Sequence, residues 1–345
     1  MIEKSAPVSN SPVSLVAQWG DVFVFQTKAF ANSDDSNAIN KQQMLQKKQN
    51  SYGEFNLGLH VNDYSKQVLT NRMRLLSVIN EQLSEQQFNK QLSSKPPTMI
   101  HSLYWVNQVH GKQIYDIDDV NDDSKLTMRT MDADAMVSKQ ANVGLAIMTA
   151  DCVPIVLYQP ATKRIAAIHA GWQGLAFGVI KATAERFESN KPIQAWIGAC
   201  ISQTNYEVDR QVLGKLSAGC IENELLNSTT LDNFEQVFSE HVKTESKIEK
   251  CDNFNNKIND DDLHKSIDKL SNYATLSTDK LAVGKVKLNL PKLARAQLEY
   301  LSIIVANEVA IDCSYDETNY YSYRRQTHLQ QPATGRMALV IVRNS

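Results

Sequence analysis

Apolar and polar residues follow two distinct periods along this chain, and these periods predict where strands and helices lie. Runs rich in β-branched and aromatic residues, bounded by Gly, Pro, Asn or Asp, are typical of strands. Such runs predict strands near residues 22–25, 102–111, 143–148, 153–158, 164–168, 195–198 and 334–342.

Apolar residues at intervals of three and four mark the helical segments. Those from Val68 to Leu83 fall on one face of a helix that we expect over residues 65–86. The same spacing predicts a helix over residues 174–189. Asn289 is suited to cap another helix that runs to about residue 301.

Two polar stretches interrupt this pattern. Residues 31–51 are mostly Asn, Ser, Asp, Gln and Lys, and residues 221–284 are similarly poor in aliphatic side chains. Segments of this composition bury too little apolar surface to fold, so we expect both to be solvated insertions outside the core. The rest of the chain is long enough for one large domain or for two.

Composition and charge narrow the class of protein. The chain has 345 residues, of which 42% are hydrophobic and 21% charged, with a formal net charge of −2. This charge argues against general affinity for nucleic acid. Neither a signal peptide nor an apolar run of the roughly 18–20 residues needed for a membrane span is present, so we expect a cytoplasmic protein without a membrane partner. The five cysteines are widely separated, which predicts reduced thiols.

The predicted hairpin at 153–168 is flanked by two residues that bind metals well. In an antiparallel pair, Cys152 before the first strand would face His169 after the second. Directly opposed residues have Cβ atoms about 4.5–5.5 Å apart, close enough for a thiolate and an imidazole to share one zinc ion. A free cysteine and a histidine at strand ends also occur as ordinary packing residues, so a third ligand is needed.

His110 is the candidate for that third ligand. It stands beside Gly111 at the end of the strand predicted over 102–111, where a side chain projects beyond the sheet. With Cys152 and His169 it forms a set of three protein ligands with an open position, as in catalytic zinc sites. Other histidines in polar surroundings or near element ends are expected to be ordinary surface residues: His101, His241, His264 and His328.

Further polar residues are suited to substrate binding or to proton transfer. Residues 55–63, which include Asn56 and His60, are typical either of a site loop or of a turn that caps the next helix. Asp134 and Asp151 suit orienting a ligand histidine or handling a proton, and they equally suit capping turns.

Arg324 and Arg325 stand beside tyrosines near the C-terminal end of the sequence. Paired arginines in such a setting suit recognition of phosphate, carboxylate or a base. A solvated charged edge is the other interpretation of the same residues.

Short motifs stand in a fixed order over most of the chain outside the two polar stretches: Asn56-Leu57-Gly58-Leu59-His60-Val61-Asn62-Asp63, Gln108-Val109-His110-Gly111, Asp134-Ala135, Thr149-Ala150-Asp151-Cys152, His169-Ala170-Gly171-Trp172, Tyr206-Glu207-Val208, Ser322-Tyr323-Arg324-Arg325 and Thr334-Gly335-Arg336-Met337. Together they resemble the motifs of the YfiH-like family, also called the laccase-domain or multi-copper polyphenol oxidoreductase family and described as purine nucleoside phosphorylases. So many ordered motifs are hard to obtain by chance.

The resemblance implies an α/β (α+β) fold, in which a β-sandwich-like mixed sheet core flanked by helices forms a single domain over residues 1–345. It implies that His110, Cys152 and His169 hold zinc, with copper as the alternative metal. From the same motifs we expect His60 and Asp151 to be catalytic. We expect substrate contacts from Asn56, Gln108, Asp134, Arg324 and Arg325.

The implied activity is phosphorolysis of adenosine, inosine, guanosine and S-methyl-5′-thioadenosine, with deamination of adenosine; the partners are purine nucleosides and phosphate. Two alternatives stay open. One is a Cys-His amide hydrolase that edits peptidoglycan precursors, with Cys152 as nucleophile and His110 or His169 as its base. The other is a copper-dependent polyphenol oxidase. A non-catalytic binding protein is disfavoured by the three potential ligands.

The chain also departs from the family pattern. Gln173 stands where the family usually has an arginine, directly after His-Ala-Gly-Trp. The segment 198–203 replaces a Gly-Pro-x-Ile-Gly-Pro pattern, and Thr27-Lys28 replaces an early Thr-Arg. These departures concern contacts with substrate and anion, and they leave the expected metal ligands intact.

Overall fold

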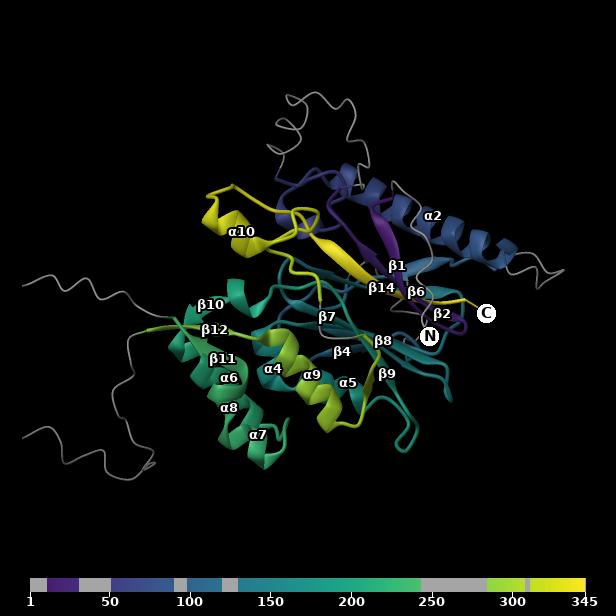
Figure 1. Cartoon of the computed structure of the whole chain (residues 1–345). Helices are drawn as coiled ribbons and strands as arrows, with labels where there is room; N and C mark the ends of the chain where they lie inside the picture. The colour runs from purple at the N-terminus through teal and green to yellow at the C-terminus, as the bar shows by residue number, and fades with distance from the viewer. Residues whose placement is uncertain are drawn as a thin grey trace, which may run out of the picture.

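The computed structural model describes residues 11–30, 51–89, 98–119, 130–242, 284–307 and 311–344. In these residues two large β-sheets stack on each other between helices (Figure 1). The first sheet has the order β1 (Val13–Trp19), β2 (Val22–Thr27), β14 (Met337–Arg343), β6 (Val143–Thr149) and β3 (Ser102–Tyr104). The second has the order β13 (Ile304–Val305), β9 (Gln194–Ile197), β7 (Val153–Gln159), β8 (Arg164–Ala170), β5 (Ala135–Ser138) and β4 (Ile114–Asp116).

Both sheets are mixed. In the first, β3 runs parallel to β6 and the other pairs are antiparallel. In the second, β13 with β9 and β4 with β5 are the parallel pairs. A small antiparallel sheet has the order β10 (Glu207–Asp209), β12 (Lys285–Leu288) and β11 (Ser239–His241).

The core between the large sheets follows from the alternation of side chains along each strand. Leu145 and Ile147 of β6 pack against Val156 and Tyr158 of β7. The intervening residues of each strand point to the outer face and are buried under helices. Strands buried on both faces have continuous apolar sequences, which explains the unbroken runs in β6, β7 and β14.

Helices cover the two outer faces of this sandwich (Figure 1). The helix α2 (Ser65–Asn89) packs on the first sheet through Leu75, Ile79 and Leu83, which confirms the helix predicted over 65–86. The second sheet is covered by α4 (Trp172–Phe177), α5 (Val179–Ala184), α6 (Arg210–Glu222) and α9 (Leu290–Tyr300). The expected single-domain sandwich flanked by helices is therefore confirmed. Among the described helices, none has both the length and the apolar character needed to cross a bilayer.

Two local predictions were wrong. The helix expected over 174–189 is divided into α4 and α5, because Gly178 adopts a left-handed conformation with φ 80°. The strand expected over 102–111 ends at Tyr104, so His110 lies in a loop. The strand expected at 22–25 is confirmed as β2, and it forms a hairpin with the preceding strand β1.

The described part of the second predicted insertion is folded and partly buried, so the expectation that it lies outside the core was wrong for this part. Within 221–284, the helices α7 (Ser228–Asp232) and α8 (Phe234–Phe238) and the strand β11 are folded. Leu225, Leu226, Phe234 and Phe238 are buried in the core beside α6 and α9. Scattered apolar residues are enough to pack short helices in an otherwise polar stretch. The remainder, 243–283, and nearly all of the first insertion, 31–50, lie outside the described residues.

Candidate functional site: a His-Cys-His cluster beside a cavity

Three potential metal ligands meet at the edge of the second sheet. His110 lies in the loop after β3, Cys152 directly precedes β7, and His169 lies in β8. Their ligand atoms all lie within 4.8 Å of one another, and Cys152 Sγ is 3.9 Å from His110 Nε2. A sulfur and a nitrogen on one tetrahedral zinc ion lie roughly 3.5 Å apart, so this set of donors fits zinc after a small adjustment.

The register of the hairpin differs from the one we expected. His169 pairs with Pro154, and Val153 pairs with Ala170, so Cys152 is not directly opposite His169. The prediction of direct opposition was therefore wrong. Cys152 and Pro154 are two residues apart and share a face of the strand, so Cys152 is a diagonal neighbour of His169.

Asp134 fixes two of the three ligands at once. Its buried carboxylate accepts hydrogen bonds from the backbone N–H groups of His110, at 2.9 Å, and Gly111, at 2.6 Å. Its Oδ1 also lies 2.9 Å from His169 Nδ1, which leaves Nε2 for a metal. Burial opposes the charged carboxylate, but the hydrogen bonds from His169 and the two amides hold the pKa of Asp134 below its usual value.

The backbone around His110 and Cys152 is unusual. His110 has φ 60°, and Asp151, which precedes Cys152, has φ 109°.

Burial opposes ionisation of the Cys152 thiol, yet the charge of His169 and hydrogen bonds from His110 and His169 lower its pKa to about 6. The thiolate is the form that binds metals and attacks electrophiles, so Cys152 is suited to either role at neutral pH.

Asp151 ties the metal-ligand loop to the C-terminal part of the chain. Its carboxylate accepts hydrogen bonds from Ser314 Oγ, at 2.8 Å, and from the backbone N–H of Arg324, at 2.7 Å. Arg324 belongs to the short helix α10 (Tyr323–His328). Burial raises the pKa of Asp151, although these hydrogen bonds act in the opposite direction.

Two of the predicted substrate contacts already have partners within the chain. Asn56 donates to Asp63 Oδ2 at 2.8 Å and accepts from the backbone N–H of Arg336, also at 2.8 Å. Gln108 forms a two-sided pair with the backbone of Met148, with bonds of 2.7 and 2.9 Å. Both amides therefore hold the loops around the site in place.

The predicted arginine pair is similarly engaged. Arg325 donates to the carbonyl oxygens of Ser314, at 2.7 Å, and Tyr315, at 2.8 Å. Arg324 donates from Nη1 to the Glu207 carbonyl, and its guanidinium lies 5.3 Å from the ring centre of Tyr206. Of the two, Arg324 is the one placed beside an aromatic ring at the site.

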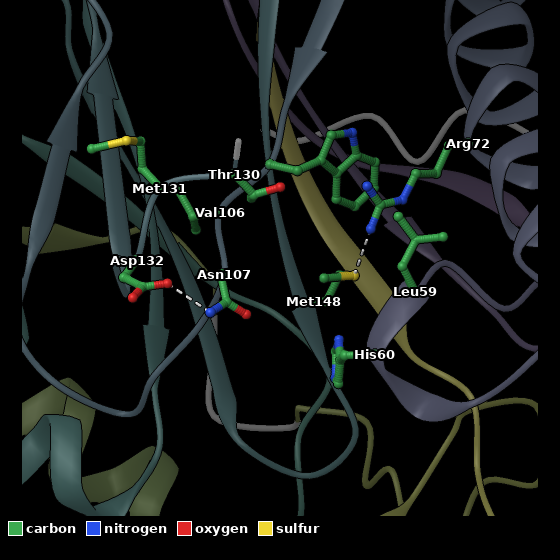
Figure 2. Close-up of a pocket in the computed structure, with 10 residues that line it drawn as sticks. Leu59, His60, Arg72, Val106, Asn107, Thr130, Met131, Asp132 and Met148 are labelled. Atoms are coloured by element: carbon green, nitrogen blue, oxygen red, sulfur yellow. Dashed lines mark hydrogen bonds between the residues drawn. The ribbon is translucent and has the colours of Figure 1, made fainter. Parts of the chain in front are cut away.

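The residues that we expected to act together line two cavities, although His60 lies close enough to His110 and His169 for their charges to act on it. A cavity of about 250 Å³ contains His110, Asp151 and Cys152, with Gln173 and Tyr206 in its wall. His60, in the 3-10 helix η1 (Leu59–Val61), lines another cavity of about 690 Å³ (Figure 2). Partial desolvation lowers the pKa of His60, and the positive charges of Arg336 and Arg72 act in the same direction.

Arg72 and Trp105 line the larger cavity and were missed by the sequence analysis. A signal was present in the spacing of α2. Arg72 occupies the apolar stripe formed by Val68, Leu75 and Ile79, at intervals of three and four residues. A charged residue on the buried face of a helix usually has a partner or a function.

A known family model and several named proteins are similar to this chain. The model of the family described as multi-copper polyphenol oxidoreductase laccase matches residues 42–241 and 249–344. The protein named purine nucleoside phosphorylase YfiH of Escherichia coli is 35% identical over 162 residues, which cover 47% of this chain and 57% of that protein. A purine nucleoside phosphorylase of Corynebacterium glutamicum is 34% identical over 192 residues, covering 53% and 70%. The chain thus spans little more than half the length of the Escherichia coli relative.

Solved structures share the fold. The hypothetical protein YfiH of Bacillus licheniformis has a TM-score of 0.60 at 22% identity, covering 96% of this chain and 97% of that one. The Neisseria meningitidis protein NMB0706 has a TM-score of 0.58 at 23% identity, covering 97% and 100%. Because the family model spans most of the sequence, this chain belongs to the multi-copper polyphenol oxidoreductase laccase family, that of the YfiH-like proteins.

Proposed function

We propose that this protein is a zinc-dependent purine nucleoside phosphorylase. The observation that carries the proposal is the cluster of His110, Cys152 and His169, whose ligand atoms lie within 4.8 Å of one another beside a cavity. Relatives that bear the name purine nucleoside phosphorylase support the same reaction. The proposed substrates are adenosine, inosine, guanosine and S-methyl-5′-thioadenosine, and deamination of adenosine is the proposed second activity.

Phosphorolysis requires three tasks of the protein. A phosphate oxygen forms a bond to C1′ of the sugar while the bond from C1′ to the purine nitrogen breaks. The purine keeps that electron pair and takes up a proton, so the products are a sugar 1-phosphate and the free base. The protein therefore has to hold phosphate, hold the nucleoside and supply a proton to the base.

We assign the proton-handling roles to His60 and Asp151. The pKa of His60 is lowered by desolvation and by neighbouring cations, which makes its ring a neutral acceptor near pH 7. Burial raises the pKa of Asp151, which favours the protonated form that can donate. When bound, zinc would supply Lewis acidity and an activated water, the chemistry that deamination needs.

The direct substrate contacts expected of Asn56, Gln108, Asp134 and Arg325 stay predictions. Their polar atoms have partners within the chain, so we propose that they also act indirectly, by holding the cavity walls. Arg324 beside Tyr206 is the better placed of the predicted contacts to meet a base.

Metal analysis and product chromatography test the proposal together. The purified protein should contain about one zinc per chain, as in sites of this ligand set, and should release adenine and ribose 1-phosphate from adenosine only when phosphate is added. His110→Ala, Cys152→Ala and His169→Ala should each lose zinc and activity together. A folded protein with stoichiometric copper that oxidises polyphenols would contradict the proposal.

A second candidate, the Cys-His amide hydrolase, is favoured by one observation. Cys152 Sγ lies 3.9 Å from His110 Nε2, and the lowered pKa of the thiol suits a nucleophile paired with a base. This function predicts a covalent adduct on Cys152 when the protein is quenched with a muramoyl-amino-acid nucleotide. Mass spectrometry would detect it, and stoichiometric zinc in Cys152→Ala beside such an adduct would reject the zinc-ligand role.

A further inference from the structure

Arg72 holds an unusual position in the wall of the larger cavity. Its guanidinium carbon lies 4.1 Å from the centre of the Trp105 ring, a cation–π geometry. Its Nε donates to the carbonyl of Leu57 at 2.9 Å. Its Nη2 points at Met148 Sδ at 3.6 Å (Figure 2). Because a thioether is a weak acceptor, the outer edge of the guanidinium is poorly satisfied.

No carboxylate neutralises this arginine in the described part of the chain. Arg72 takes part in none of the ion pairs found there, and burial lowers its pKa to about 10, so it stays charged at pH 7. Asp132 is the acidic residue in the wall of the same cavity. It is bonded to Asn107 Nδ2 at 2.7 Å, across the cavity from Arg72 in Figure 2.

A second arginine, Arg336, adds positive charge near the Arg72 end of the cavity, since it also acts on His60. His60 lines the same wall, and the charges of Arg72 and Arg336 both disfavour its protonation. A partly desolvated cation without an anionic partner is costly, and a guanidinium can bind a tetrahedral anion through two parallel N–H groups. The volume of about 690 Å³ lies within the usual range of ligand cavities.

The smaller cavity lacks a positively charged side chain of this kind among its described lining residues. Gln173 stands there in place of the family's usual arginine, and the described residues of its wall include no lysine or arginine. A phosphate in the larger cavity would therefore meet the fixed guanidinium of Arg72, whereas no guanidinium is among the described lining residues of the smaller cavity.

We propose that Arg72, supported by Trp105, is the phosphate-binding residue of this protein and that the larger cavity receives the phosphate. The inference builds on the proposed phosphorylase function, because it names the residue that holds the second substrate. The same chemistry would bind free phosphate or the 5′-phosphate of a purine nucleotide, with Asp132 and Asn107 at the far end available to hydroxyl or amino groups.

Calorimetric titration tests the site without any turnover. Inorganic phosphate, adenosine 5′-monophosphate and adenosine are titrated separately into the metal-loaded wild-type protein, Arg72→Gln, Arg72→Lys and Arg74→Gln. Arg74 is the matched control, because it lies on the same helix and is exposed, with its guanidinium 5.6 Å from the Phe55 ring. Circular dichroism and metal content establish that each variant is folded.

We expect Arg72→Gln to weaken phosphate binding by about tenfold or more, since a hydrogen bond to a charged group contributes about 1.5–3 kcal/mol. The phosphate affinity of Arg72→Lys should fall between those of the wild type and Arg72→Gln, and that of Arg74→Gln should match the wild type. Binding of phosphate together with adenosine would identify free phosphate as the ligand. Competition between phosphate and a more tightly held monophosphate, sensitive to Arg72→Gln, would identify the nucleotide.

The outcomes separate this inference from the proposed function. Phosphate binding that depends on Arg72, without phosphorolysis, would keep the site and reject the reaction. Phosphorolysis with the same KM for phosphate in the wild type and in folded Arg72→Gln would reject the site. The site would also be rejected if Gln173→Arg lowered this KM while Arg72→Gln left phosphate binding unchanged. Failure of the wild-type protein to bind phosphate or the monophosphate overturns the inference whatever the variants do.

Discussion

Asp134 shows how one side chain organises two metal-ligand candidates at once. Its carboxylate orients the ring of His169 and also fixes the backbone of the loop that carries His110. Replacing a carboxylate that orients a metal-binding histidine typically costs 10–100-fold in metal affinity. The double role of Asp134 places this site toward the upper end of that range.

Asp134→Asn is therefore expected to lower zinc affinity by about 100-fold. The asparagine keeps the size of the side chain but loses an acceptor facing two backbone N–H groups and a histidine. Competition with a chromophoric chelator measures the change. Asp232→Asn, at an exposed position in α7, is the control and should keep wild-type affinity; equal affinities in the two variants would contradict the prediction.

Gly171 is confined by the ligands themselves. A Cβ at this position would lie 3.1 Å from Cys152 Sγ and 3.2 Å from His110 Cδ2, tighter than an ordinary contact. Gly171→Ala should therefore push the ligands apart and lower zinc affinity while the fold persists. Gly214→Ala in α6, where nothing lies within 4 Å, should leave zinc binding unchanged and stabilise the helix by about 0.5–1 kcal/mol. Chelator competition and thermal unfolding of both variants provide the measurement.

At the scale of elements, the break between α4 and α5 lets two short helices pack where a single helix was expected. Gly178 has φ 80°, and a Cβ there would lie 2.9 Å from Leu225 Cδ2. The absence of a side chain at Gly178 therefore leaves room for Leu225, which is buried in the core beside the second sheet. The packing of this supposed insertion depends on a glycine outside it.

Gly178→Ala should destabilise the protein by about 2–4 kcal/mol, of which about 1–2 kcal/mol is the left-handed conformation and the remainder is the contact with Leu225. Gly20→Ala isolates the first contribution, because Gly20 has φ 63° and nothing lies within 4 Å of the added Cβ. Urea denaturation compares the two. Equal losses would show that the segment near Leu225 yields without cost.

At the scale of the whole molecule, the two sheets bring distant parts of the chain to one site. Cys152 directly precedes β7 of the second sheet, His169 lies in β8, and His110 lies in the loop that connects β3 of the first sheet to β4 of the second. His60 and Arg72 come from segments that cover the first sheet. Asp151 and Ser314 connect the site to the C-terminal segment. The cavities therefore exist only when both sheets have stacked.

The polar stretch 221–284 consists of a folded part, residues 221–242, and a remainder that we expect to be replaceable. The strands β11 and β12 are antiparallel, and the N–H of Val242 bonds to the Lys285 carbonyl at 3.3 Å, so a short turn can join residues 242 and 285. Replacing 244–283 by such a turn should leave the midpoint of thermal unfolding nearly unchanged, since loop entropy varies slowly with length. Removal of 222–278 should abolish folding, because it takes Phe234 and Phe238 from the core.

Phe238→Ala provides the quantitative counterpart, with an expected loss of about 3–5 kcal/mol. Val237→Ala, at a partly buried neighbour, should cost less. Thermal and urea unfolding measure both. A full-length protein that tolerates Phe238→Ala without loss would show that α8 is not part of the stable fold.

The sequence by itself determined the features that depend on local pattern. Unbroken apolar runs identified β6, β7 and β14, and the spacing from Val68 to Leu83 identified α2. The three metal-ligand candidates were also identifiable, because Cys152 and His169 flank one hairpin and their convergence requires only antiparallel pairing. Period and residue chemistry are sufficient for such predictions.

Only the tertiary structure decided how these elements meet. It shifted the hairpin so that His169 pairs with Pro154, and it placed Asp134 beneath two ligands at once. It also separated His60 from Asp151 into different cavities and set Arg72 against Trp105. These arrangements depend on which residues far apart in the chain become neighbours. Local periodicity carries no information on that choice, since the stacking of the two sheets determines it.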